Sequence, residues 1–160
     1  MTEPTSILFM ESARMLMANF FAMLLMGQIT GHLLTLIVIS AAAQCFLGAL
    51  WYGVIFKKSW KKLLGIAEDQ KPKNQIFGVA ASLIGCFILS FVLAHILGWA
   101  GSITGMDGAA IGIVCWFGFM APPLFVQHVF ERRPANLLAI NASYWLVAMA
   151  LGGAILAAFH

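Results

Sequence analysis

Four long stretches without a charged residue constrain the fold of this chain more than any other feature. They are residues 33–56, 76–98, 109–128 and 135–159. A helix needs roughly 20 apolar residues to cross the hydrocarbon layer of a bilayer, and each stretch is about that long or longer. The sequence therefore predicts an all-α integral membrane protein, in which two hairpins form a bundle of four transmembrane helices.

The composition excludes a soluble domain. Hydrophobic residues make up 62% of the 160 residues and charged residues only 9%, whereas soluble domains are roughly 45–50% apolar and about 25% charged. The net charge of +3 arises mainly from lysines in one short loop, which favours acidic lipid headgroups over nucleic acid. We therefore expect the chain to interact with the lipid bilayer and not with nucleic acid.

The positions of Lys and Arg predict the orientation, because cytoplasmic loops of membrane proteins collect these residues. Six of the nine lie in residues 57–75 and two in residues 129–134, whereas the connection between the second and third stretches carries only Asp107. We expect both basic loops to be cytoplasmic and the C-terminus to be periplasmic, in a multi-pass protein of the bacterial inner membrane. The basic residues expected at lipid headgroups are Lys57, Lys58, Lys61, Lys62, Arg132 and Arg133.

The first basic loop contains a short amphipathic pattern. Residues 59–67 place Trp60, Leu63, Leu64 and Ala67 on one face of a helix and lysines on the other. This pattern is typical of a helix that lies in the headgroup region, although a solvated basic loop would also account for it.

Residues 1–31 precede the first long stretch and form a separate segment. Their apolar part, residues 7–26, is interrupted by Glu11 and Arg14. An amphipathic helix in the plane of the membrane, an additional span and a signal-like segment are all compatible with this pattern, and we favour the first.

Polar and aromatic residues gather at one depth near the cytoplasmic ends of the helices. Trp51 and Tyr52 lie about one turn from the end of the first stretch, and Asn141 lies one to two turns into the fourth. Two consecutive prolines at similar depth should break or kink the third helix and free backbone carbonyls. These groups predict either a small polar pocket or interhelical hydrogen bonds with an aromatic belt. The candidate ligand-binding residues are Trp51, Tyr52, Pro122, Pro123, Glu131, Asn141 and Tyr144.

The histidines and cysteines give little indication of a cofactor. His32 and His95 are expected near the periplasmic ends of their helices, where they could ligate a b-type haem or a metal, although interfacial histidines are commoner. Cys45, Cys86 and Cys115 occur singly in three different stretches, without a paired-cysteine motif. We expect the cysteines to be small core residues, and we expect no cofactor.

A short motif occurs twice in the chain. Trp51-Tyr52-Gly53, in the first stretch, is echoed by Trp116-Phe117-Gly118 in the third. Two related hairpins would produce such an echo, as the parallel repeats of some transporters do, and chance would produce it as easily.

Three separated blocks resemble a known family. They are residues 50–60 (LWYGVIFKKSW) with 63–65 (LLG), residues 119–122 (FMAP) with Phe130-Glu131 and Arg133-Pro134, and residues 140–147 (INASYWLV). From about residue 32 onward the chain resembles the bacterial membrane family known as domain of unknown function 1761. Val54 stands where that family pattern has a proline, so the end of the first helix should be straighter here. The resemblance implies a four-helix inner-membrane domain and supplies no activity.

The functional hypotheses rest on this architecture. The chain carries no catalytic motif, and the four stretches contain no Asp or Glu, which argues against a proton-coupled pump. We expect a protein that is not an enzyme and that binds or passes a small molecule or lipid in the inner leaflet. One alternative is an accessory or scaffolding subunit of a homo- or hetero-oligomer, whose faces Gly108-xxx-Gly112 and Ala148-xxx-Gly152 pack against partners. Another is a redox subunit that carries haem or metal on the two periplasmic histidines.

Overall fold

The computed structural model of the protein describes residues 11, 14, 31–67, 75–101 and 104–159. The chain divides into two units, residues 1–34 and 35–160. In the first unit, Glu11 and Arg14 are helical and exposed. The remainder of the N-terminal helix predicted for residues 1–31 lies outside the described residues, apart from Gly31.

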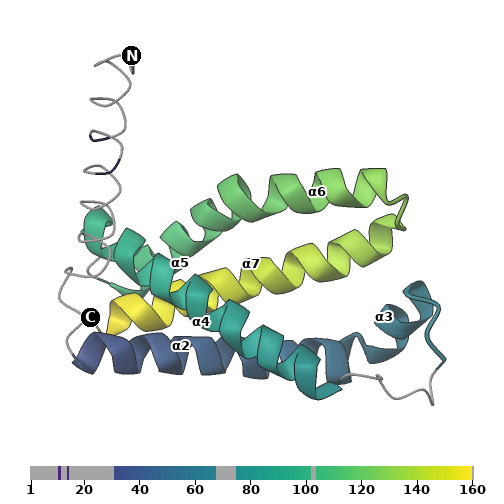
Figure 1. Cartoon of the computed structure of the whole chain (residues 1–160), viewed down its shortest axis with the longest axis horizontal. Helices are drawn as coiled ribbons and strands as arrows, with labels where there is room; N and C mark the ends of the chain where they lie inside the picture. Colours follow the sequence, from purple (N-terminus) through teal and green to yellow (C-terminus); the bar gives the residue numbers. More distant parts are fainter. Residues whose placement is uncertain (1–10, 12–13, 15–30, 68–74, 102–103, 160) are drawn as a thin grey trace, which may run out of the picture. The chain divides into compact units, whose positions relative to one another are not determined.

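The described residues fold into helices without a strand (Figure 1). Four of the helical segments are long and apolar enough to cross a membrane: Gly31–Ile55, Ile76–Ala100, Gly105–Phe130 and Ala135–Ala158. The predicted all-α fold with four transmembrane helices is thereby confirmed. The elements in chain order are α2 (Gly31–Leu50), η1 (Trp51–Ile55), α3 (Lys57–Leu63), α4 (Gln75–Ala100), α5 (Gly105–Cys115), η2 (Trp116–Met120), α6 (Ala121–Phe130) and α7 (Ala135–Ala158).

The third span begins four residues before its predicted start because a capping box fixes its first turn. The side chain of Thr104 accepts a hydrogen bond from the backbone N–H of Asp107 (3.2 Å), and Oδ2 of Asp107 accepts one from the backbone N–H of Thr104 (3.1 Å). These bonds satisfy donors that a helix otherwise leaves unpaired at its N-terminus. The prediction placed Asp107 in the loop because it followed hydrophobicity alone.

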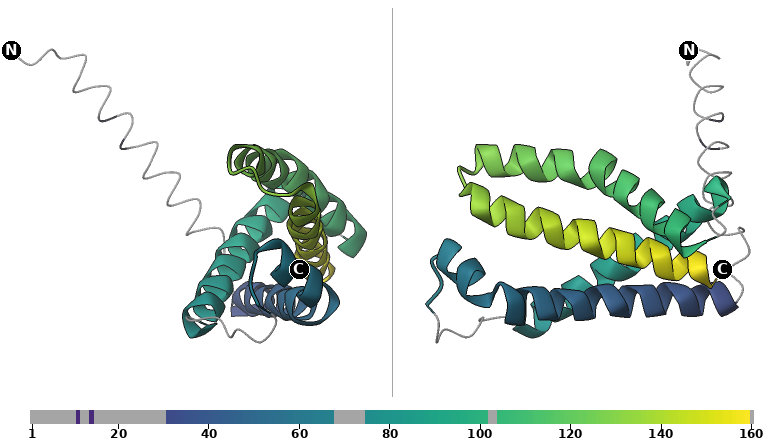
Figure 2. Two further views of the ribbon diagram at one scale, coloured as in Figure 1. Left: turned by 90° about the vertical axis from the view of Figure 1, so that its right-hand side faces the viewer. Right: turned by 180° about the vertical axis from the view of Figure 1, so that it is seen from behind.

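Within the second unit, α7 lies between α5 and α6 on one side and α2 on the other, and α4 crosses α2 (Figures 1 and 2). Glycines let α5 and α7 approach closely. A Cβ added to Gly108 would overlap the carbonyl oxygen of Gly153, and a Cβ added to Gly112 would overlap that of Met149. Such contacts between small residues are a common basis of helix packing in membranes.

The same packing corrects one expectation from the sequence. The faces Gly108-xxx-Gly112 and Ala148-xxx-Gly152 were expected to be available to partner subunits. All four residues are buried inside the chain, where α5 packs against α7 and Gly152 approaches the side chains of α2. These faces are therefore not available to another subunit.

Both copies of the Trp-aromatic-Gly motif form a turn of π-helix. η1 begins at Trp51 and η2 at Trp116, and each closes with a backbone hydrogen bond from the residue five positions later. α6 follows η2 directly, with Pro122 and Pro123 in its first turn, where a missing N–H costs little. The span changes direction between α5 and α6 (Figure 1), so the predicted kink is present and the π turn accommodates it.

The two basic connections meet at one end of the second unit. α3 and the turn from α6 to α7 lie at the same end of the bundle in Figures 1 and 2. The lysines of α3 and the two arginines of the turn therefore share an end of the bundle, as the pattern of charges predicted.

Candidate functional site

An aromatic cluster at the α3 end joins η1 to α7. The indole Nε1–H of Trp51 donates a hydrogen bond to the carbonyl oxygen of Ile140 (3.1 Å), and the hydroxyl of Tyr52 donates one to Oδ1 of Asn141 (3.2 Å). The ring of Tyr144 lies 5.1 Å from that of Tyr52 in an edge-on arrangement. Offset and edge-on ring pairs of this kind are favourable beyond the area that they bury.

The same cluster holds α3 in place. Trp60, on α3, packs its ring 5.4 Å from the ring of Tyr52. Because Tyr52 is also bonded to α7 through Asn141, the short helix is connected to the central helix of the bundle through one phenol ring.

The structure brings together four of the seven residues proposed as a ligand pocket. These four residues are Trp51, Tyr52, Asn141 and Tyr144. They take part in hydrogen bonds and ring contacts between η1 and α7, as in ordinary packing between helices. The other three residues lie outside the aromatic cluster, on α6 or just beyond its end. Pro122 and Pro123 are exposed in the first turn of α6, and Glu131 is exposed beyond its end.

Nearer the middle of the bundle, a buried polar network links three helices. Nε2 of Gln44 donates to the hydroxyls of Ser90 (2.9 Å) and Ser40 (3.2 Å), and Ser90 donates to Ser40 (3.1 Å). Ser40 in turn donates to the carbonyl oxygen of Gly152 (3.4 Å). Ser40, Gln44 and Ser90 each have an exposed fraction of 0%. Such hydrogen bonds fix the register of helices inside a membrane.

The three cysteines lie on three different spans. Cys86, on α4, and Cys115, on α5, are buried, and Cys45, on α2, is half-buried. All three cysteines are free thiols. Cys86 and Cys115 match the expectation of small core residues.

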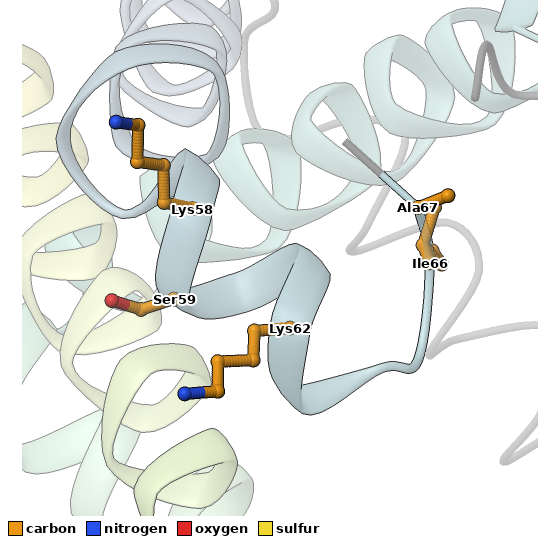
Figure 3. Close-up of a pocket in the computed structure, with 5 residues that line it drawn as sticks. All are labelled: Lys58, Ser59, Lys62, Ile66 and Ala67. Atoms are coloured by element: carbon orange, nitrogen blue, oxygen red, sulfur yellow. The ribbon is translucent and has the colours of Figure 1, made fainter. Parts of the chain in front are cut away.

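α3 carries a basic face beside a cavity of about 370 Å³. The side chains of Lys58, Ser59 and Lys62 are exposed and extend to the same side of α3, and Ile66 and Ala67 lie on the opposite side (Figure 3). The residues that line the cavity are Lys58, Ser59, Lys62, Ile66 and Ala67. This volume lies within the range of small-ligand sites.

The sequence of the chain matches the family described as protein of unknown function (DUF1761) over residues 35–157. The chain belongs to the DUF1761 family. No curated protein and no solved structure matches it. The family description names no activity, so a function for this DUF1761 protein has to be inferred from its side chains.

The histidines proposed for haem or metal lie in different units of this DUF1761 protein. His32 is exposed in the first unit. His95 lies on α4 in the second, where its Nδ1–H donates a hydrogen bond to the carbonyl oxygen of Phe91 (2.8 Å). Among the described residues, no group of three or more His, Cys, Asp or Glu side chains could hold a metal ion.

The turn between α6 and α7 contains the two arginines that were expected to contact lipid headgroups. Arg132 and Arg133 are exposed there, and Arg133 forms an ion pair with Glu131. Nε2 of Gln127 donates a hydrogen bond to Oε1 of Glu131 (2.8 Å). This hydrogen bond, together with the charge of Arg133, holds the pKa of Glu131 below its ordinary value. Glu131 is thus an anion with local partners in the same turn.

Proposed function

We propose that this protein binds an anionic phospholipid at α3, with the phosphate on Lys58, Ser59 and Lys62. The observation that carries the proposal is the single exposed face on which two ammonium groups and a hydroxyl extend together, beside a cavity (Figure 3). A phosphate oxygen accepts hydrogen bonds from all three groups, and its charge is opposite to that of the lysines.

The second support is that α3 suits a membrane surface. Trp60 and Leu63 are half-buried, whereas Lys57, Lys58 and Lys62 are exposed. A helix with this division lies in the headgroup region, with its lysine stems along apolar groups and its ammonium groups in water. The aromatic cluster anchors α3 to the bundle and so gives the site a fixed position.

We place this site in the cytoplasmic leaflet. The basic residues of α3 and of the turn from α6 to α7 lie at one end of the bundle (Figure 1), and such residues accumulate on the cytoplasmic side. That leaflet carries anionic lipids, whose attraction is worth about 1 kcal/mol for each Lys or Arg near the surface. The expected ligand and the expected orientation are therefore consistent with each other.

The test is native mass spectrometry of the full chain released from nanodiscs that contain phosphatidylglycerol and phosphatidylcholine. We expect the chain to retain phosphatidylglycerol. We expect Lys58→Gln with Lys62→Gln to weaken retention roughly a hundredfold or more, since each lysine loses a hydrogen bond to a charged group that is worth about 1.5 kcal/mol or more.

The matched control is Lys57→Gln with Arg132→Gln, which removes the same charge at the same end without touching the cavity. We expect it to retain most of the lipid. An equal loss in both double variants would show a diffuse attraction of charges and would contradict a defined site, as would retention of phosphatidylcholine alone.

A further inference from the structure

The chain turns back directly after α3, and this turn builds the apolar wall of the cavity. Gly65 has a φ of 68°. Its backbone N–H donates to the carbonyl oxygen of Lys62 (3.2 Å), and the N–H of Ile66 donates to that of Lys61 (3.0 Å). This pair of bonds is the Schellman ending of a helix, in which glycine is favoured at the left-handed position. Nζ of Lys61 also donates to the carbonyl oxygen of Ala67 (3.5 Å), so the turn is fixed to α3 by three hydrogen bonds.

The cavity retains two ammonium groups and one hydroxyl. Lys61 bonds to the turn and does not line the cavity, whereas Lys58, Ser59 and Lys62 do. Lys58 and Lys62 are one helical turn apart and therefore share a face. In the view of Figure 3, the Ser59 hydroxyl lies between the two ammonium groups. Within the part of the chain that the structure describes, neither of these two lysines forms an ion pair.

The number of donors and charges distinguishes between two kinds of phosphate. A phosphodiester, such as the headgroup of phosphatidylglycerol, has two unesterified oxygens and one negative charge, which leaves one ammonium group without a counter-charge. A phosphomonoester has three acceptor oxygens and a charge of about −1.5 to −2 at neutral pH, so each of the three donors can have its own oxygen and both lysines are neutralised. We propose that this site prefers a phosphomonoester, the headgroup of phosphatidic acid, over a phosphodiester. This inference rests on the proposed lipid binding at α3.

The apolar wall favours a lipid over a soluble phosphomonoester. Ile66 is half-buried and Ala67 is exposed, and both line the cavity. They offer apolar surface to the glycerol backbone and the first acyl carbons of a lipid, and burial of such surface is favourable. A soluble phosphate ester such as glycerol 3-phosphate has no acyl chain to place there.

The experiment is native mass spectrometry of the full chain released from phosphatidylcholine nanodiscs that contain equal amounts of phosphatidic acid, phosphatidylglycerol and phosphatidylmethanol. We expect roughly tenfold more retention of phosphatidic acid than of either diester, as one additional hydrogen bond to a charged group predicts. Phosphatidylmethanol is the matched diester, because its headgroup is larger than that of phosphatidic acid by only a methyl group. Equal retention of these two lipids would mean that headgroup size decides, and it would overturn the proposal.

Ser59 provides the variant that separates a fitted site from simple attraction of charge. Ser59→Ala should lower retention of phosphatidic acid roughly tenfold and that of phosphatidylglycerol by less, because the two oxygens of a diester keep both lysines. Ser59→Thr retains the hydroxyl and should retain the preference. An unchanged preference in Ser59→Ala would contradict the assignment of the third oxygen to this hydroxyl.

The remaining outcomes separate this inference from the proposed function. Equal retention of phosphatidic acid and phosphatidylglycerol would overturn the preference and leave the anionic lipid site in place. Retention of neither above phosphatidylcholine would overturn both. Glycerol 3-phosphate at millimolar concentration should not displace the lipid, and complete displacement would assign the site to a soluble phosphomonoester and overturn the lipid as its ligand.

Discussion

At the scale of single residues, two adjacent glycines on α7 serve two different neighbours. Gly153 meets α5, where an added Cβ would overlap the backbone carbonyl of Gly108. Gly152 meets α2, where an added Cβ would overlap the end of the Gln44 side chain. A backbone group cannot move without moving its helix, whereas the end of a glutamine can rotate, so the two positions tolerate a methyl group differently.

We therefore expect Gly153→Ala to lower the free energy of unfolding by about 1–3 kcal/mol, the usual cost of overpacking. Gly152→Ala should lower the free energy of unfolding by less, because the Gln44 side chain can rotate away, although it then loses hydrogen bonds. The measurement is equilibrium unfolding in mixed detergent micelles. Gly85→Ala is the control, because a Cβ at Gly85 would meet nothing within 4 Å, and it should leave stability unchanged or slightly raised. An equal effect at positions 85 and 153 would contradict the proposed packing.

Sequence periodicity identified some of the interacting residues and missed others for a physical reason. Trp51, Tyr52 and Asn141 could be placed at one depth because each lies near the end of an apolar stretch, where counting turns is accurate. The contacts of Ser90 with Ser40 and with Gln44 depend on the rotation and register of two helices. Apolar residues surround these positions on most sides, so the hydrophobic pattern does not reveal which face is inward.

At the scale of elements, both copies of the Trp-aromatic-Gly motif form a π-helical turn, but their tryptophans differ in hydrogen bonding. η1 and η2 both begin at the tryptophan of the motif, which supports the interpretation of two related hairpins. Trp51 donates to α7, whereas the buried Nε1 of Trp116 has no acceptor among the described residues. The π turn therefore belongs to the motif itself, and the hydrogen bond from its tryptophan to α7 is made by the first copy.

The bond between η1 and α7 can be measured with a double-mutant cycle. Tyr52→Phe and Asn141→Leu each remove one side of the hydrogen bond between the two residues. We expect a coupling energy of about 0.6 kcal/mol and at most about 1.7 kcal/mol, the range found for interhelical hydrogen bonds in membranes. The readout is again the free energy of unfolding.

Ser143→Ala provides the control cycle, because the Ser143 hydroxyl donates to the carbonyl oxygens of Ala139 and Ile140 in its own helix. It should show no coupling with Tyr52→Phe. Zero coupling between Tyr52 and Asn141 would mean that the two side chains do not interact in the membrane.

At the scale of the whole molecule, composition and charge were sufficient to predict the fold class and the number of spans. The third span is longer than predicted because a capping box at Thr104, and not hydrophobicity, sets its first turn. No more than 33% of the most apolar part of any span is buried inside the chain. Most side chains of the spans therefore remain for lipid to cover, which is why the apolar stretches are nearly uniform and carry little information about contacts.

The orientation of the whole molecule is the last prediction. Because Lys and Arg concentrate at the α3 end, that end should face the cytoplasm and the connection between α4 and α5 should face the opposite side. In a chain whose three cysteines are replaced by alanine, Ser59→Cys places a thiol at the α3 end, and Met106→Cys places one at the opposite end of the bundle; both positions are exposed. An impermeant maleimide should label position 59 only in inside-out vesicles and position 106 only in right-side-out vesicles. The reverse pattern would place the lysines of α3 on the side with fewer anionic lipids, and the proposed lipid site would then lose its expected ligand.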